Sequence, residues 1–446
     1  MNKSNGKTIV LLLVILTTVI SLTLLQKPTN QQPPVVVAVA SLASQPKGDI
    51  LSKIDYRLQS MMEKGELSQE VEMIVTFQGI SSTKGVGLLK FLGDITILET
   101  YSIIGGTLIK APLGMATNIA TQKYVKSVIH NYKVKVHSTI YGALQATTTT
   151  YSANIEQIGA TRLHRLGING TGIKVAVLDT GINTHEALPP DKIIYNKSFV
   201  LGEDSGDLNG HGTHVAGIIA GYCEGKYVGV APGAQLLNIK VLDRKGEGKL
   251  NDLIKGINES VTQGANVISI SAGALINDPN DPVCQAANNA MLHGVVVVAA
   301  AGNEGPDSST INAPGEAALA ICVGAVTSSN IIPDFSSRGP TSDNRVGVTL
   351  VAPGVNIVSL DYDDSSGYVT MSGTSQATPH VSGAVALLLS NMSLTPSTVK
   401  AALMATAVDL GEDPYAQGCG LINVSAAYDL LVSGRTPVAV SPPKLT

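Results

Sequence analysis

The pattern of apolar and polar positions first separates a compact N-terminal unit, in which short strand-like and helix-like segments alternate. Strand-like segments alternate apolar and polar residues with a period of two, whereas helix-like segments follow a period near 3.6. A short amphipathic helix is expected between residues 49 and 70, before this unit. The order of segments predicts a β-α-β-β-α-β unit of the ferredoxin-like type. Its expected strands are Val71–Phe77, Ile95–Tyr101, Thr107–Ala111 and Val125–Val136, and its expected helices are Lys84–Leu92 and Met115–Lys123.

The second half of the chain has a different pattern, in which short, continuous apolar runs alternate with helical segments. Strands without polar alternation are buried on both faces, as in a parallel sheet covered by helices on each side. This pattern predicts an α/β domain, and ligands of such folds bind at the carboxyl ends of the strands. Its expected strands are Lys174–Leu178, Leu236–Val241, Val267–Ile270, Val295–Ala300 and Ile321–Val326, and its expected helices are Val215–Ala220, Leu250–Gln263, Ala286–Leu292 and Val385–Leu389.

The N-terminus is expected to act as an export signal. Lys3 and Lys7 precede an apolar run from Ile9 to Leu25, typical of a signal peptide or of an uncleaved signal anchor. Both alternatives place the protein outside the cell or on its surface, and membrane contact is expected only for the anchor. The expected organisation is 1–26 signal peptide or anchor, 27–70 linker and short helix, 71–137 first unit, 138–150 linker, 151–432 second domain and 433–446 tail.

Composition narrows the class of partners. The net charge is −4 and no basic stripe with interleaved aromatic residues is present, so nucleic acid is not an expected partner. The chain is expected to be a monomer. Four cysteines give an even count, which favours disulfides in an exported protein with three pairings open, and buried free thiols are the alternative. They are Cys223, Cys284, Cys322 and Cys419.

Three motifs carry candidate chemistry. Asp179 ends the apolar strand Val175-Ala176-Val177-Leu178, and His211 lies in Gly210-His211-Gly212-Thr213-His214-Val215-Ala216-Gly217. Ser375 lies in Gly373-Thr374-Ser375-Gln376-Ala377-Thr378-Pro379-His380, a glycine-flanked turn that runs into an apolar helix. Pro379 is expected in the first turn of that helix, where backbone amides need no partner. His211 and His214 lack the glutamate and third ligand of a zinc motif, so metal is not expected there.

At these residues the sequence resembles the subtilisin-like serine proteases, the subtilase family, from about Thr148 to Leu431. The order Asp, His, Ser is the order of that family. The resemblance implies a serine endopeptidase in which Ser375 is the nucleophile, His211 the general base and Asp179 the residue that orients the imidazole. It also implies that the Asn303 amide, in Val295–Gly305, binds the oxyanion.

The resemblance further implies how protein or peptide substrates bind. Gly246-Glu247-Gly248 and Ser271-Ala272-Gly273 match the two segments that pair with an extended peptide, and Asn312 matches the floor of the pocket for the side chain before the cut. The N-terminal unit is similar to the inhibitory prodomain of subtilisins. Self-cleavage is then expected between about His137 and Tyr151, and the mature start of relatives suggests the threonine run 147–150.

The sequence departs from the family at its calcium loop. Residues 221–227 are shorter and differ in character, and the expected aspartate position falls near Glu186-Ala187. The usual calcium site is therefore not supported, and no cofactor is required for the chemistry. Acidic stretches at Asp278–Asp281 and Asp361–Asp364 fit calcium binding and exposed turns equally well.

Two alternatives to a peptidase come from other classes of protein. A non-catalytic scaffold protein is disfavoured because all the motifs are intact. An esterase is disfavoured because Ser375 lies in Gly-Thr-Ser-x-Ala and not in a GxSxG turn.

Overall fold

The computed structural model describes residues 50–136, 138–144 and 153–437. The apolar run 9–25 and the threonine run 147–150, on which the expectations of export and of a mature start rest, lie outside the described residues. Among the helices that the structure describes, none combines the length and the apolar character needed to cross a membrane.

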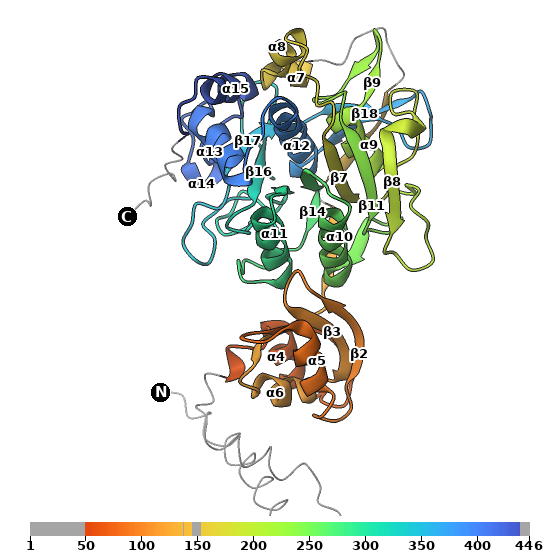
Figure 1. Ribbon diagram of the computed structural model, residues 1–446, viewed down its shortest axis with the longest axis vertical. Coiled ribbons are helices and arrows are strands. Elements are labelled where there is room, and N and C mark those ends of the chain that lie inside the picture. Colours follow the sequence, from red (N-terminus) through yellow and green to blue (C-terminus); the bar gives the residue numbers. More distant parts are fainter. Residues whose placement is uncertain (1–49, 137, 145–152, 438–446) are drawn as a thin grey trace, which may run out of the picture. The chain divides into compact units, whose positions relative to one another are not determined.

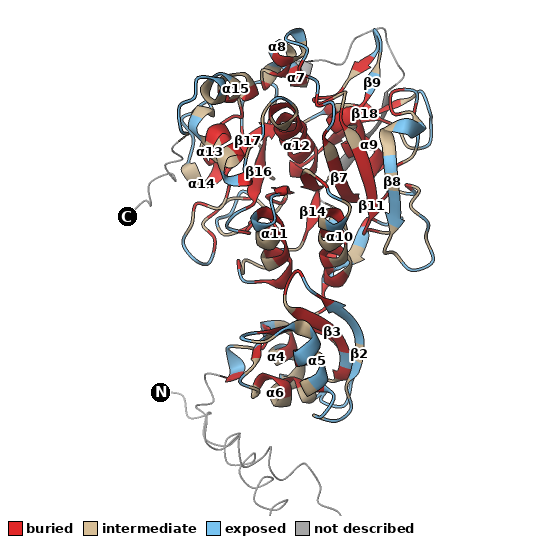
Figure 2. Cartoon of the chain, in the orientation of Figure 1, coloured by how far each residue is buried: buried red, intermediate tan, exposed pale blue. Residues whose placement is uncertain are grey.

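The N-terminal unit is a four-stranded antiparallel sheet with the strand order β2-β3-β1-β4. Two helices connect its strands, which gives the expected β-α-β-β-α-β order. The core side chains Met73, Leu89, Ile109 and Ile119 are fully buried, whereas most of the edge strand β2 is exposed (Figure 2). The elements are β1 Glu70–Phe77, α5 Ser82–Leu89, β2 Thr96–Tyr101, β3 Gly106–Pro112, α6 Met115–Ala120 and β4 Val125–His130.

A short helix before β1 also belongs to this unit. Helix α4 (Tyr56–Glu63) buries Leu58, and its N-cap Asp55 accepts a hydrogen bond from the Arg57 amide. The preceding residue, Ile54, forms a bridge with Val128 of β4. The folded unit therefore begins at about Ile50, well before the first strand.

The expected single strand Val125–Val136 is wrong, because the structure divides it into two strands in different sheets. Strand β4 ends at His130, and β5 (Lys133–Val136) pairs with β12 (Glu247–Lys249) and β14 (Ala272–Gly273) of the second domain. The break falls at Asn131 and Tyr132. Asn131 hydrogen-bonds to Asn251 of the second domain, so its polar side chain turns the chain out of the first sheet.

The second domain is built on a seven-stranded sheet with the order β17-β16-β15-β13-β7-β11-β8, in which every pair is parallel (Figure 1). The central strands have no exposed residue, which explains their continuous apolar sequences. The strands are β7 Lys174–Asp179, β8 Ile193–Ser198, β11 Gln235–Lys240, β13 Val267–Ile270, β15 Val296–Ala300, β16 Ile321–Val326 and β17 Leu350–Pro353.

Helices cover the two faces of this sheet. Helices α9 (His211–Ala220) and α12 (Thr374–Asn391) contact one another and pack on one face. Helices α10 (Leu250–Thr262) and α11 (Pro282–Leu292) also contact one another and pack on strands of the same sheet. The result is the three-layer α/β architecture that the sequence predicts (Figure 1).

Shorter elements complete the domain. A second small sheet has the order β18-β19-β6 and lies next to the N-terminus of α12, since β19 ends at Ser372. The remaining elements are β6 Thr139–Leu144, α7 Ala153–Gln157, α8 Ala160–Arg165, a 3₁₀ turn Pro190–Lys192, β9 Tyr222–Cys223, β10 Tyr227–Val228, β18 Ile357–Leu360, β19 Tyr368–Ser372, α13 Pro396–Thr406, α14 Pro414–Gln417 and α15 Val424–Val432.

The four cysteines are free thiols, so the expected disulfides are not present. Cys284 in α11 and Cys322 in β16 are buried, and burial raises the pKa of both thiols. They pack as small apolar side chains in the core, which is the role that buried free cysteines usually have. Cys223 in β9 and Cys419 in the turn after α14 are half-buried.

Candidate active site

Three neighbouring strands end at one edge of the large sheet and deliver the candidate site residues there. In the parallel register, Ile270 of β13 lies opposite Leu178 of β7 and Ala299 of β15. Asp179 follows Leu178 and Ser271 follows Ile270, so the two are level on adjacent strands. Asn303 follows the end of β15 after a short turn. This edge is the ligand-binding edge of parallel sheets.

Asp179 and His211 form a buried hydrogen-bonded pair. The Nδ1 atom of His211 lies 2.7 Å from Oδ1 of Asp179, and both side chains are only 1% exposed. The same carboxylate oxygen accepts a hydrogen bond of 2.8 Å from the Thr180 amide. A proton on Nδ1 leaves Nε2 as the unprotonated nitrogen of a neutral imidazole, which is the form that acts as a base.

The two chain segments that carry this pair touch through their backbones. A Cβ atom on Gly212 would lie 2.0 Å from the carbonyl oxygen of Gly181. Gly181 has φ 109°, and a Cβ on it would meet the Ser205 and Gly206 carbonyl oxygens at 2.6 Å. Both positions therefore require glycine.

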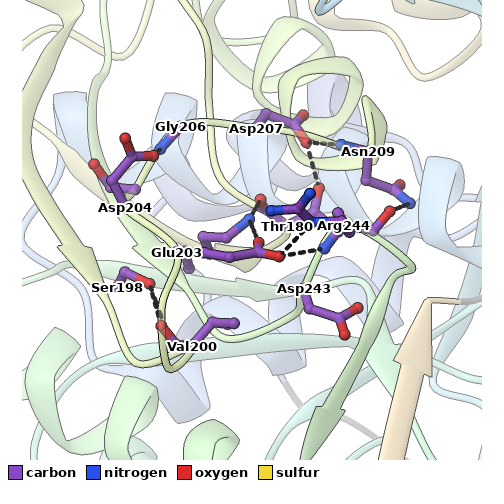
Figure 3. Close-up of polar contacts among 12 residues, drawn as sticks. Thr180, Ser198, Val200, Glu203, Asp204, Gly206, Asp207, Asn209, Asp243 and Arg244 are labelled. Atoms are coloured by element: carbon purple, nitrogen blue, oxygen red, sulfur yellow. Dashed lines mark hydrogen bonds and ion pairs between the residues drawn. The ribbon is translucent and has the colours of Figure 1, made fainter.

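Asp207 ties the same two segments together (Figure 3). Its 1%-exposed carboxylate accepts hydrogen bonds from the Thr180 hydroxyl and from the Gly210 amide. It also accepts from the amide and hydroxyl of Thr213 and from the amide of Asn209. Five donors on one carboxylate hold the start of α9 against the residue that follows Asp179.

A buried lysine lies on the other side of Thr180. The Nζ atom of Lys240 donates to the Thr180 carbonyl and lies 3.1 Å from Oε2 of Glu203. The Lys240 side chain is 0% exposed, so Glu203 supplies the counter-charge that its burial requires. The other Glu203 oxygen lies 2.9 Å from Nε of the exposed Arg244 (Figure 3). Burial opposes ionisation of Glu203, but hydrogen bonds from Arg244 and Lys240 outweigh it and lower its pKa.

Ser375 lies at the start of α12 and exchanges two hydrogen bonds with Ser271. The Ser375 hydroxyl donates to the Ser271 carbonyl at 2.7 Å, and the Ser271 hydroxyl donates to the Ser375 carbonyl at 2.9 Å. Pro379 explains why that carbonyl is accessible. The structure places Pro379 inside α12 and not in its first turn as expected, and proline has no N–H to donate to the carbonyl four residues earlier.

The Asn303 side chain is oriented by Thr374, the residue before Ser375. Its Oδ1 atom accepts a hydrogen bond of 3.0 Å from the Thr374 amide and one of 2.9 Å from the Thr374 hydroxyl. With the oxygen fixed in this way, the Nδ2 amide group is the end that presents donors. Because Thr374 adjoins Ser375, this donor group and the serine are held by the same turn.

The other histidines of the motifs are buried and neutral. Burial, assisted by the neighbouring His211, lowers the pKa of His214 to about 3, and its Nε2 atom lies 3.1 Å from the Ile357 carbonyl. Burial lowers the pKa of His380 to about 4. By contrast, Nε2 of His211 has no hydrogen-bond partner within the described residues. Nδ1 of His214 also lacks a partner among these residues, but of the three imidazoles only His211 is hydrogen-bonded to Asp179, so its Nε2 atom is the candidate base.

The two expected peptide-pairing segments flank β5. Glu247 and Gly248 pair with Lys135 and Val134, while Ala272 and Gly273 pair with Val136 and Lys135, all antiparallel. The Val136 amide also donates to the Gly246 carbonyl at 3.0 Å. Gly246 has φ 72°, and a Cβ on it would lie 2.8 Å from the Val136 side chain. The segment 133–136 thus lies as the middle strand between both.

The Asn312 side chain packs against Gly302, the residue before Asn303, since a Cβ on Gly302 would lie 2.7 Å from it. Asn312 is 1% exposed, and its backbone N–H donates to the Ala301 carbonyl. The fully buried Glu316 follows shortly after. Burial, with the nearby Asp281, raises the pKa of Glu316 to about 8, so this carboxyl is largely neutral at pH 7.

Strand β6 pairs with β19, the strand that leads into the helix of Ser375. Thr139 pairs with Ser372 and Leu144 with Tyr368, so β6 runs antiparallel along β19 for its whole length. Ser372 is three residues before Ser375, whereas Val136 pairs with the residue next to Ser271. The chain therefore enters beside Ser271 and leaves beside Ser372.

No cluster of histidine, cysteine and acidic side chains suited to a metal occurs in the described part of the chain. The stretch Asp278–Asp281 provides the N-cap of α11 through Asp281, and Asp364 accepts hydrogen bonds from Ser366. In the loop 221–227, Cys223 and Tyr227 pair across a small hairpin. Both acidic stretches thus have local structural roles.

Comparison with known proteins agrees with this architecture. The family model described as the subtilase family matches residues 170–421. Subtilisin BL of Lederbergia lenta is 42% identical over 276 residues, which are 61% of this chain and 97% of that protein. Serine protease AprX of Bacillus subtilis is 36% identical over 314 residues, covering 62% and 70% of the two chains.

A solved structure is also similar. Fervidolysin from Fervidobacterium pennivorans, described as a keratinolytic enzyme related to subtilisin, superposes with a TM-score of 0.68 at 25% identity. The match covers 81% of this chain and 61% of that one, so this chain spans about three fifths of the solved protein. The chain belongs to the subtilase family and is a subtilisin-like serine protease. Enzymes of this class need no cofactor for catalysis.

Several residues of the site were not singled out in the sequence. Thr180 and Thr374 bond directly to Asp179 and Asn303. Asp207 and Lys240 bond to Thr180, and Glu203 pairs with Lys240, so these three act on the site indirectly. The one available signal was position, since Asp207 and Thr374 lie inside or beside the motifs of His211 and Ser375. Glu203 and Lys240 are 37 residues apart and carried no signal at all.

Proposed function

We propose that this protein is a secreted serine endopeptidase, made as a self-inhibited precursor that cuts itself, with Asp179, His211 and Ser375 as its catalytic triad. The observation that carries the proposal is the position of residues 133–136. They pair as a strand with both peptide-binding segments, and Thr139 further along the chain pairs with Ser372, three residues before Ser375. A strand added between two such segments is how an extended peptide substrate is held. The precursor thus contains its own first substrate.

The chemistry follows from the arrangement. The Ser375 hydroxyl rotates from the Ser271 carbonyl to Nε2 of His211, gives up its proton there and attacks the peptide carbonyl carbon. The resulting oxyanion accepts hydrogen bonds from the Asn303 Nδ2 group and the Ser375 amide. His211 then protonates the leaving amine as the C–N bond breaks. Water repeats the sequence on the acyl-enzyme and releases the acid, while Asp179 stabilises the imidazolium in both halves.

The N-terminal unit fits the role of an inhibitor because it satisfies groups that the enzyme alone leaves open. Helix α10 has no side-chain N-cap of its own. The Tyr132 carbonyl accepts from the Leu250 amide at 2.9 Å, and Oδ1 of Asn131 accepts from the Asn251 amide at 3.0 Å. Ion pairs Lys249–Glu72 and Lys255–Glu99 join the same surfaces. Binding of this unit therefore covers the peptide-binding edge and stabilises α10.

We infer the position of the first cut from the register of the strands on either side of it. Val136 pairs next to Ser271 and Thr139 pairs with Ser372, and these two partners flank Ser375 in space. The cut bond therefore lies between Val136 and Thr139, at the beginning of the range expected from the sequence and before the threonine run. The N-terminal run 9–25 supports export of the precursor.

Two measurements test the proposal. The full-length precursor is expected to appear as two fragments, whereas Ser375→Ala should remain in one piece after export. Ser390→Ala, in the last turn of the same helix, is the matched control and should process normally. A fluorophosphonate probe should label Ser375 only after the N-terminal unit has been removed. Normal processing of the Ser375→Ala chain, or labelling of another serine, would show that the triad is wrongly assigned.

A further inference from the structure

Strand β6 lies directly after the proposed first cut, so that cut does not remove it from the protease domain. It spans Thr139–Leu144 and forms the third strand of the sheet β18-β19-β6. A cut between Val136 and Thr139 separates it from the N-terminal unit but leaves it covalently joined to the protease domain. The N-terminal unit can then dissociate from the protease domain, whereas β6 remains covalently attached to that domain near Ser375.

Strand β19 depends on β6 for its pairing on one side. Its other neighbour is β18, with Ile357 opposite Met371 and Leu360 opposite Tyr368. Without β6, β19 would be an edge strand with a row of open N–H and C=O groups, and a two-stranded hairpin is only marginally stable. Such an edge, ending three residues before Ser375, is where the part of a substrate that follows the cut bond would pair.

From this geometry we propose that β6 acts as a second, intramolecular inhibitor after the first cut. It occupies the β19 edge and competes with the residues of a protein substrate that follow its cut bond. Full activity on proteins then requires a second cleavage that removes residues 139–144, downstream of the first. This inference rests on the proposed function, and it assigns β19 as the binding edge for the leaving half of the substrate.

In the competition with protein substrates for the β19 edge, β6 has the advantage because it is tethered to the protease domain. A segment linked by a short connection has an effective concentration in the millimolar range. Protein substrates at micromolar concentration must displace it from every pair between Thr139–Ser372 and Leu144–Tyr368. Small substrates that end in a chromogenic amide have no residues on that side, so they do not need the β19 edge. Inhibition by the N-terminal unit should therefore affect both kinds of substrate, whereas inhibition by β6 should affect only substrates with residues after the cut bond.

The experiment weakens β6 without touching the triad. In a strand, one of any two neighbouring amides points to the partner strand, so the double variant Ala143→Pro/Leu144→Pro removes a ladder donor. Thr147→Pro/Thr148→Pro, beyond the end of β6, is the matched control. Each variant is produced as the full-length precursor and isolated after the first cut. The mass of the new N-terminal fragment confirms that this cut has occurred. Its kcat/KM is then measured on a peptide p-nitroanilide and on a quenched peptide with five residues after the cut bond.

We expect the 143/144 variant to raise the ratio of quenched-peptide to nitroanilide activity about tenfold over the parent, and the 147/148 variant to leave it unchanged. An unchanged ratio in the 143/144 variant, with both substrates cleaved, would overturn the role of β6 but not the proposed function. Loss of cleavage of both substrates by the parent would overturn both.

Amide hydrogen exchange gives a readout that does not depend on the variants. In the parent chain, the amides of Tyr368–Ser372 are expected to stay protected after the first cut and to lose protection once residues 139–144 are gone. Loss of protection at the first cut itself would mean that β6 leaves at once, and the inference would be wrong.

Discussion

Ser271 and Ser375 hold one another through two hydrogen bonds, each hydroxyl donating to the other residue's carbonyl, at 2.9 and 2.7 Å. Pro379 has no N–H to donate to the Ser375 carbonyl four residues earlier in α12, and the Ser271 hydroxyl donates to that carbonyl. Ser271 thus compensates for a gap in the helix that carries the proposed nucleophile. Its backbone lines the peptide-binding segment while its side chain fixes the serine turn.

This relationship predicts the effect of Ser271→Ala. The variant keeps the carbonyl that accepts from Ser375 but loses one hydrogen bond to a buried acceptor, at a cost of about 1–1.5 kcal/mol. We expect kcat/KM on a peptide substrate to fall about 5- to 10-fold. Pro379→Ala supplies a helical N–H for the same carbonyl, so its addition to Ser271→Ala should recover part of the loss. Strictly additive effects of the two changes would contradict the link between them.

Asn303 is expected to act in the transition state and not in substrate binding. In subtilisin itself, loss of the corresponding amide donor lowers turnover by roughly 10²–10³-fold, and we expect the same order here. Asn303→Asp keeps the oxygen to which Thr374 donates but removes the Nδ2 donor, whereas Asn303→Ala removes both. Both variants should lose kcat with little change in KM, and only the alanine variant should also lower Tm. A rise in KM at constant kcat would contradict this role.

Glu203 is expected to matter for stability far more than its neighbour Arg244. Glu203→Gln leaves the buried Lys240 ammonium without a counter-charge, which costs about 3–5 kcal/mol in comparable cases. Arg244→Gln breaks only the exposed half of the cluster and should cost less than about 1 kcal/mol. Thermal unfolding of both variants in the Ser375→Ala background, where self-digestion does not interfere, measures the difference. Equal losses would mean that Lys240 is compensated by other groups.

Glu316 predicts a pH dependence of stability with a definite sign. Its pKa is raised from 4.5 to about 8 in the folded protein, mainly by burial, so between these values the folded state holds a proton that the unfolded chain releases. The stability that this proton provides is present below pH 4.5 and is lost as the pH rises towards 8. Glu316→Gln does not titrate, so its Tm relative to the parent should increase through this window.

The expected gain at pH 8 is on the order of 5 °C. Differential scanning fluorimetry of the Ser375→Ala chain from pH 4.5 to 9 is the measurement. Glu412→Gln, at an exposed position, is the control and should follow the parent at every pH. A constant offset between the Glu316→Gln variant and the parent would contradict the raised pKa.

The sheet and its helices were predictable because their periodicity is strong and local. Strands Val267–Ile270 and Ile321–Val326 have the expected bounds, since both are buried throughout and rich in β-branched residues. Strands β8 and β17 were missed. β8 alternates and is exposed at several positions as an edge strand, and β17 contains a proline that masks its pattern.

The candidate site was predictable only where a motif carries it. Asp179, His211, Ser375 and Asn303 lie in short local patterns. The break between β4 and β5 was not predictable, because strand-forming apolar residues recur along 125–136 and the contact of Asn131 with Asn251 at the break forms only in the fold. The same holds for Thr180, whose three polar groups bind Asp179, Asp207 and Lys240 from three separate segments.

The close approach of Gly212 to the Gly181 carbonyl means that the spacing between carboxylate and imidazole is set by main chain against main chain. Ordinary side-chain variation elsewhere in the core shifts packed groups by fractions of an ångström, but here no side chain intervenes to transmit the shift. A peptidase engineered on this scaffold can therefore accept many substitutions in its core and its specificity loops, provided that Gly181 and Gly212 both remain glycine.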